Sequence, residues 1–125
     1  MLNRKYDLEE RLVNFGATII NTAEKLPRSF AGNHLAGQLI RSGTSPALNY
    51  GEAVSAESRS DFIHKMKIAL KELRETNNCL KIINRVNWLD NEIIALELKE
   101  CNELISIFVK SIGTAQANKL ALKAK

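Results

Sequence analysis

Five basic side chains along one predicted helix are the residues of this chain best suited to binding chemistry. They are Lys67, Lys71, Arg74, Lys81 and Arg85. A helical rotation of about 100° per residue places them within an arc of about 80°, about 27 Å long, that holds no acidic residue. Each phosphate that such a stripe neutralises would release counterions, so the pattern fits a nucleic-acid backbone.

The same five cations also fit a surface that faces water or a partner protein. The outer face of a bundle helix is normally polar, and Lys and Arg are good helix formers. Aromatic side chains for stacking on bases and a recognisable RNA-binding motif are both missing. RNA and protein partners therefore both stay open for this face.

Residues for catalysis are sparse. A di-iron site in a helix bundle needs Glu-x-x-His pairs on two helices, whereas the two histidines here, His34 and His64, do not follow a Glu at that spacing. Phosphate-loop, dinucleotide and nucleophile-elbow motifs are absent. Cys79 and Cys101 lack metal-site spacing and are predicted to lie in the core. We expect a non-enzyme without metal, cofactor or small-molecule substrate.

Three polar residues lie on a predicted helix that otherwise consists mainly of small and apolar residues. They are Arg41, Asn49 and Glu52. Buried hydrogen bonds can fix a helix that a proline disturbs, and Pro46 lies between these residues. We therefore favour a structural role for the three over a ligand site.

Four apolar seams place all these residues on helices. Apolar side chains recur at alternating three- and four-residue steps, while strand signals are nearly absent. The predicted helices span about 7–26, 33–56, 60–86 and 91–113, and a tail follows at 114–125. Pro27 ends the first helix, Pro46 kinks the second, and Ser58 or Ser60 caps the third.

Short links between these helices predict an all-α, antiparallel, up-down-up-down four-helix bundle. A length of 125 residues suits a single domain covering 1–125. Trp88, in the last link, is predicted to plug one end of the bundle. The start lacks the apolar core of a secretory signal and no window reaches a membrane span, so we expect a cytoplasmic protein without a membrane partner.

Two of the predicted helices carry more apolar surface than an isolated bundle can bury, which predicts contacts between subunits. The candidate interface residues are Ile68, Ile82 and Val86 on the third helix and Ile93, Leu96, Leu104 and Ile107 on the fourth. Residues 58–85 carry seven basic and three acidic side chains, and 86–103 carry one and five. The third helix of one subunit against the fourth of the next would therefore close a head-to-tail ring.

Four stretches of the chain resemble one known family. They are Gln38-Leu39-Ile40-Arg41-Ser42, Asn49-Tyr50-Gly51-Glu52-Ala53, Ser58-Arg59-Ser60-Asp61-Phe62-Ile63 and Ala69-Leu70-Lys71-Glu72-Leu73-Arg74-Glu75-Thr76. In order and spacing they are similar to the small four-helix-bundle proteins encoded in intervening sequences of bacterial 23S ribosomal RNA genes. The family's usual Asn-Ile-Ala-Glu-Gly appears here with Asn49 and Glu52 kept and the glycine moved.

The resemblance implies a homopentameric ring of bundles. It also extends to an accessory protein of diversity-generating retroelements, a basic pentamer that engages nucleic acid and a reverse transcriptase. Two functions are consistent with both the residues and the resemblance. The first is a non-catalytic homo-oligomeric scaffold that contacts ribosomal or other RNA, or a ribonucleoprotein, through the basic stripe. The second is a protein-only adaptor whose charges serve subunit assembly.

Overall fold

Four helices and no strand make up the part of the chain that the computed structural model describes, residues 4–124. The helices are α1 (Arg4–Ala23), α2 (Phe30–Val54), α3 (Arg59–Val86) and α4 (Asn91–Ala124). The prediction of an all-α four-helix bundle is confirmed. The predicted single domain also includes residues 1–3 and 125, which lie outside the described part.

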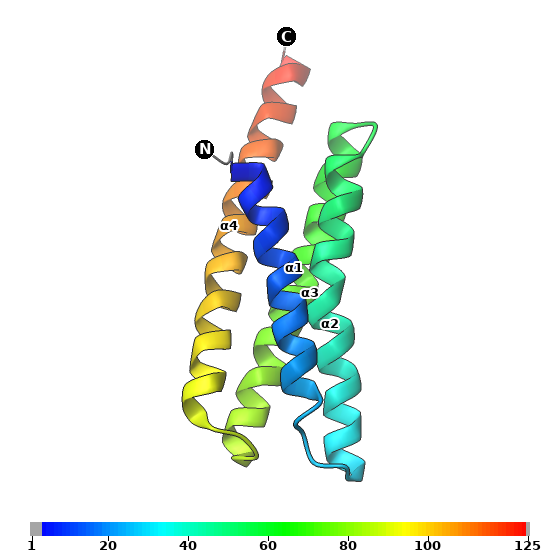
Figure 1. Cartoon of the computed structure of the whole chain (residues 1–125). Helices are drawn as coiled ribbons and strands as arrows, with labels where there is room; N and C mark the ends of the chain where they lie inside the picture. The colour runs from blue at the N-terminus through cyan, green and yellow to red at the C-terminus, as the bar shows by residue number, and fades with distance from the viewer. Residues whose placement is uncertain (1–3, 125) are drawn as a thin grey trace.

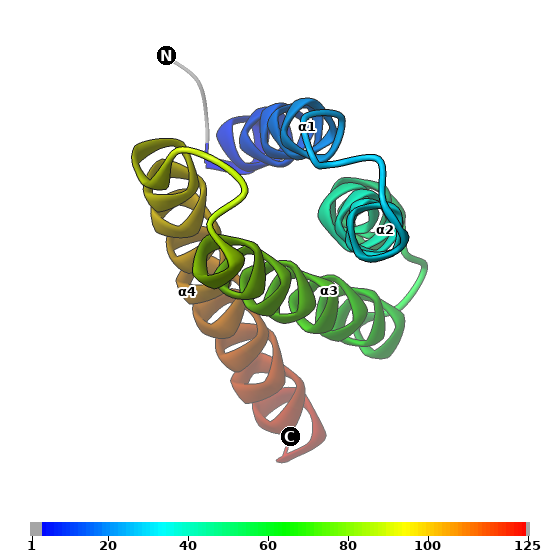
Figure 2. The same cartoon turned by 90° about the horizontal axis from the view of Figure 1, so that it is seen from below.

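Successive helices run in alternating directions along the molecule (Figure 1). α3 packs against both α2 and α4, and α1 packs mainly against α2. The contact between α1 and α4 is the smallest of the four helix pairs. Figure 2, seen from one end of the bundle, shows why, because α4 leans so that its C-terminal end lies away from α1.

Side-chain caps set where three of the helices begin. The Ser29 hydroxyl accepts a hydrogen bond from the Gly32 N–H at 3.0 Å, so α2 starts three residues before the predicted position. The Ser58 hydroxyl accepts one from the Asp61 N–H at 3.0 Å, which confirms the predicted cap of α3. At the start of α4, the Asp90 carboxylate accepts one from the Glu92 N–H at 2.9 Å. Each bond satisfies a backbone donor that the helix itself leaves open.

Three helices end at other residues than predicted, and for α2, which ends at Val54, the difference from 56 is small. α1 ends at Ala23, and the next residues form a turn in which the Lys25 N–H bonds to the Thr22 carbonyl at 3.0 Å. α4 continues through Gly113 to Ala124, so the predicted tail is its last third. A glycine in a helix costs only about 1 kcal/mol, and the Ala, Gln, Lys and Leu that follow are strong helix formers.

Apolar seams from all four helices meet in one core. Its largest fully buried side chains are Leu12, Ile19, Leu39, Met66, Leu73, Leu80, Ile83, Ile94, Leu104 and Phe108. Cys79 and Cys101 are buried free thiols, as predicted. Burial raises the pKa of the Cys101 thiol to about 11, so this sulfur stays protonated at neutral pH. Trp88 is half-buried and packs against the core, in the link between α3 and α4.

α2 is a single helix that passes through Pro46, which is buried. A bend of α2 at this proline stays a prediction. Within the described residues, no helix combines the length and the apolarity that crossing a membrane requires.

Gly43 lets α2 approach α1. A Cβ atom at this position would lie 2.5 Å from Cγ2 and 3.0 Å from Cβ of Ile19. Ile19 is fully buried and branched at Cβ, so it has little freedom to turn away. A Cβ atom at the exposed Gly37, on the same helix, would meet nothing within 4 Å.

We expect Gly43→Ala to lower the free energy of unfolding by about 1–3 kcal/mol, because the added methyl overpacks the α1–α2 contact. Gly37→Ala is the matched control and should raise it by about 0.5–1 kcal/mol, since alanine is the better helix former and has room there. Urea unfolding followed by circular dichroism measures both. Equal stabilisation by the two alanines would show that α1 and α2 do not meet as described.

Glu97 is a buried carboxylate at the small contact between α4 and α1. Its Oε2 accepts a hydrogen bond from the Thr22 hydroxyl, while its buried Oε1 has no hydrogen-bond partner among the described residues. Burial raises the pKa of Glu97, and the Thr22 hydrogen bond and the Lys25 charge offset part of that rise. The folded state therefore holds the proton more tightly than the unfolded state, so stability falls as pH rises through the range between the two pKa values.

We expect Glu97→Gln to raise the melting temperature at pH 7 by about 4 °C, equivalent to about 1 kcal/mol. The gain should disappear near pH 3.5, below the usual glutamate pKa of about 4.3, where the wild-type carboxyl is neutral in both states. Thermal unfolding across pH measures this. Glu92→Gln, at an exposed site in the first turn of the same helix, serves as the control and should give no gain at pH 7, because it loses a favourable interaction with the helix dipole. A pH-independent effect at Glu97 would contradict the assignment.

Candidate functional site

The five predicted cations Lys67, Lys71, Arg74, Lys81 and Arg85 are all exposed along α3. Among the described residues none of them forms an ion pair, because the recorded pairs use Arg11, Arg41 and Lys65 as cations. The helix is anchored by fully buried side chains such as Leu73 and Leu80 and is held by α2 on one side and α4 on the other. The basic stripe is thus displayed on a rigid element.

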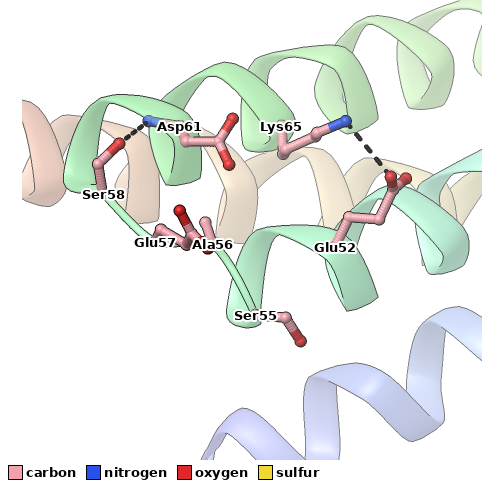
Figure 3. Close-up of a pocket in the computed structure, with 7 residues that line it drawn as sticks. All are labelled: Glu52, Ser55, Ala56, Glu57, Ser58, Asp61 and Lys65. Carbon is pink, nitrogen blue, oxygen red and sulfur yellow. Dashed lines mark hydrogen bonds and ion pairs between the residues drawn. The ribbon is translucent and has the colours of Figure 1, made fainter.

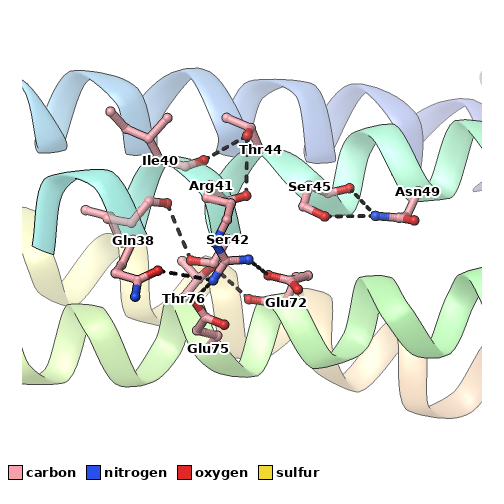
Figure 4. Close-up of polar contacts among 11 residues, drawn as sticks. Gln38, Ile40, Arg41, Ser42, Thr44, Ser45, Asn49, Glu72, Glu75 and Thr76 are labelled. Atoms are coloured by element: carbon pink, nitrogen blue, oxygen red, sulfur yellow. Dashed lines mark hydrogen bonds and ion pairs between the residues drawn. The ribbon is translucent and has the colours of Figure 1, made fainter. Parts of the chain in front are cut away.

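Arg41 on α2 binds the two acidic residues in the middle of α3 (Figure 4). Its guanidinium lies 2.8 Å from the Glu72 carboxylate, it forms a second ion pair with Glu75, and it donates to the Gln38 side chain at 3.3 Å. Both carboxylates are therefore turned toward α2 and away from the stripe, which leaves the outer face of α3 with one sign of charge. Arg41 was singled out from the sequence but its acidic partners were not, although the position of Glu72 and Glu75 beside the stripe was a usable signal.

The other two polar residues of α2 act separately. The Asn49 amide donates to the Ser45 carbonyl at 3.1 Å and to the Ser45 hydroxyl at 2.8 Å, next to Pro46 (Figure 4). Glu52 is exposed and pairs with Lys65 of α3 at 3.4 Å. The three residues therefore do not form one buried network, because Arg41 and Glu52 lie at the surface and reach α3 while Asn49 bonds within α2.

A pocket lies beside the loop between α2 and α3 (Figure 3). It measures about 500 Å³ and is lined by Glu52, Ser55, Ala56, Glu57, Ser58, Asp61 and Lys65. Three of its polar side chains already have structural partners, since Lys65 pairs with Glu52 and the Ser58 hydroxyl caps α3. Across the described residues, no three His, Cys, Asp or Glu side chains are placed to hold a metal ion.

Of the seven apolar residues predicted to contact other subunits, four are exposed, two are half-buried and one is buried. Ile82, Val86, Ile93 and Leu96 are 51%, 48%, 39% and 70% exposed, and Ile68 and Ile107 are half-buried. Leu104 is fully buried, so its assignment to an interface was wrong. It follows Glu97 by two helical turns, on the side of α4 that faces α1, and therefore belongs to the core of its own subunit.

The four exposed residues of this predicted set form two separate faces. Ile82 and Val86 follow Glu75, the Arg41 partner, by about two and three helical turns, so they lie on the side of α3 that faces α2. We call them the α3 face. The Glu100 carboxylate pairs with Arg11 of α1 at 2.6 Å. Ile93 lies about two turns before Glu100 and Leu96 about one turn before it, so both lie on the same side of α4 as Glu100. We call them the α4 face.

The two faces differ in the charges that surround them. The α3 face adjoins Lys81 and Arg85, both exposed. On the α4 face, Leu96 lies between the exposed Glu92 and Glu103, one turn before it and two turns after it. Cations therefore adjoin the α3 face, while the α4 face has two carboxylates and one cation, Lys99, within two turns of Leu96.

Comparison with known proteins gives consistent results. The model of the 23S rRNA-intervening sequence protein family matches residues 4–110. A crystal structure of a protein of unknown function from the S23 ribosomal protein family of Bacteroides thetaiotaomicron superposes with a TM-score of 0.79. It is 30% identical, and the match covers 84% of this chain and 97% of that one. No curated protein matches the chain in sequence. With the model covering most of its length, the chain belongs to the 23S rRNA-intervening sequence protein family.

Proposed function

We propose that this chain is a non-catalytic, ring-forming scaffold that binds RNA along α3. The observation that carries the proposal is the row of five exposed cations, none paired with a described acidic group. The descriptions of the family and of the related crystal structure both point to the ribosome, so ribosomal RNA is the first RNA to test.

Binding along this stripe should depend on phosphates and not on base identity. Lys and Arg neutralise a backbone over about 27 Å of helix, and the stripe includes no aromatic side chain on which a base could stack. Affinity should therefore fall steeply with salt and vary little with sequence. The part of Arg41 is to hold the nearby carboxylates away from the RNA.

The proposed ring rests on the two apolar faces. A contact between unlike faces of successive copies is heterologous, and it closes into a ring when the rotation between copies permits. The cations around the α3 face and the carboxylates around the α4 face would attract each other across such a contact. Five copies are the number that the family resemblance implies.

A protein-only adaptor is the second candidate function, and the carboxylates around Leu96 favour it. If they neutralised the whole stripe of the neighbouring copy, no cations would remain for RNA. The RNA titration below separates the two functions.

RNA binding can be tested by reversing two cations in the middle of the stripe. We expect Lys71→Glu with Arg74→Glu to lower the affinity for a ribosomal RNA fragment at least about 10-fold and to reduce the salt slope by about 2, one per lost phosphate contact. Fluorescence anisotropy across a salt series measures both. Arg28→Glu with Lys123→Glu is the control, because it makes the same change in net charge at exposed sites outside the stripe and both apolar faces. An equal loss in the control, or no binding by the wild type at about 50 mM salt, would contradict RNA binding through the stripe.

The ring can be tested by breaking one face at a time. We expect light scattering to give about 70 kDa for the wild type, five copies of 14.0 kDa. Ile82→Glu and Leu96→Glu should each yield monomers, because each removes one side of every contact. Mixed together, the two variants should form a heterodimer of about 28 kDa, since one pair of intact faces remains.

Leu120→Glu is the control for this assembly test. Leu120 is 69% exposed, close to the 70% of Leu96, but lies on neither face. This variant should assemble like the wild type. A monomeric wild type, or variants that stay monomeric after mixing, would rule out the proposed contact.

A further inference from the structure

A large groove opens at the end of the bundle where α1 begins. It has a volume of about 1130 Å³ and is lined by the start of α1, the end of α2, the start of α3 and the second half of α4. Figure 1 shows its origin, because α4 and the α2–α3 end both extend beyond the first turn of α1. At this level of the bundle α2, α3 and α4 continue, whereas the described part of α1 begins at Arg4.

The lining of the groove combines an apolar surface with cations. Leu8, Phe62 and Ile107 contribute apolar surface, and Phe62 and Ile107 are half-buried. Among the described residues, the cations of the lining are Arg11, Arg59 and Lys110, and its carboxylate is Glu57. Arg11 already binds Glu100 and Glu103, whereas Arg59 and Lys110 are exposed and form no ion pair within the described residues.

Part of this groove lies outside the region that defines the family. Ser111, Thr114, Ala115 and Asn118 line it from α4, and the family model matches only to residue 110. Residues 104–125 hold four basic side chains and no acidic one. The extended end of α4 therefore builds a wall of the groove, and beyond that wall it carries Lys119 and Lys123.

We propose that this groove binds an acidic amphipathic helix of another protein. An amphipathic helix seated in the groove would set its apolar positions, three and four residues apart, against Phe62 and Ile107. Carboxylates along its flanks would pair with Arg59 and Lys110 at the edge of the groove. This surface is separate from the cation stripe and from the α3 and α4 faces, so the inference goes beyond the proposed function.

Charge argues against a second copy of the chain as the occupant. The end of α4 exposes Leu120 and Leu122, at 69% and 59%, and could supply an apolar face. It also carries Lys119 and Lys123 and no carboxylate, so it would bring like charge to Arg59 and Lys110. Two aromatic side chains, Phe62 and Tyr50, line the groove. Phe62 is half-buried and Tyr50 is buried, so neither offers an open ring on which a base could stack, and this disfavours RNA as the occupant.

A peptide selection against the full-length chain tests the proposal. A displayed library of random helical peptides about four turns long should yield binders with apolar residues at three- and four-residue steps and a net negative charge. In anisotropy titrations with the best binder, Arg59→Glu with Lys110→Glu should weaken binding at least about 10-fold. The matched control is Lys71→Glu with Arg74→Glu, which changes the net charge equally on α3 and should leave the affinity unchanged.

Several results would overturn the proposal. They are the absence of any enriched peptide, enrichment of basic or neutral peptides, an equal loss in the α3 control, and displacement of the bound peptide by an RNA oligonucleotide. A scrambled peptide of the same composition that binds equally well would show attraction by charge alone and would also overturn it. Circular dichroism reports whether each variant is folded, and Ile107→Asn gives an independent loss of the apolar surface if the charge-reversed protein unfolds.

Discussion

Three consecutive residues of α2 hold together the helix contacts on which the rest of the bundle depends. Arg41 pairs with Glu72 and Glu75 of α3. The Ser42 hydroxyl is hydrogen-bonded to that of Thr76 at 2.9 Å inside the same contact. Gly43 faces the other way and leaves room for Ile19 of α1. One turn of α2 therefore fixes the distance and the register of α2 relative to α1 and α3. Larger or differently charged side chains in this turn could not do so.

The contact between α2 and α3 explains the stretches of sequence that carry the family resemblance. Gln38–Ser42 and Ala69–Thr76 lie far apart in the sequence, yet the structure joins them through Arg41 with Glu72 and through Ser42 with Thr76. Asn49 bonds to Ser45 around Pro46, and Ser58 caps α3. The motifs thus describe how α2 meets α3 and where α3 begins, which explains why they can be recognised in a chain without catalytic residues.

Features that depend on the local sequence pattern were predicted correctly, whereas features that depend on how the helices tilt against one another were not. The seams, the Ser58 cap, the buried Cys101 and the exposed face of the stripe all follow from helical periodicity and were found correctly. Periodicity alone could not place Leu104, because the width of the buried side of α4 depends on how α1 crosses it. The groove was missed for the same reason, since it arises from the lean of α4 and from a helix that continues past Gly113.

In the proposed ring, assembly and RNA binding would share part of α3. Lys81 and Arg85 are stripe residues that also adjoin Ile82 and Val86 of the α3 face. A neighbouring α4 seated there would bring carboxylates beside these two cations and neutralise them. Lys67, Lys71 and Arg74 lie two turns or more from Ile82, so they would keep their charge for RNA. Assembly would thereby restrict the RNA-binding surface to the first half of the stripe and repeat it once per subunit around the ring, which favours a long or folded RNA over a short strand.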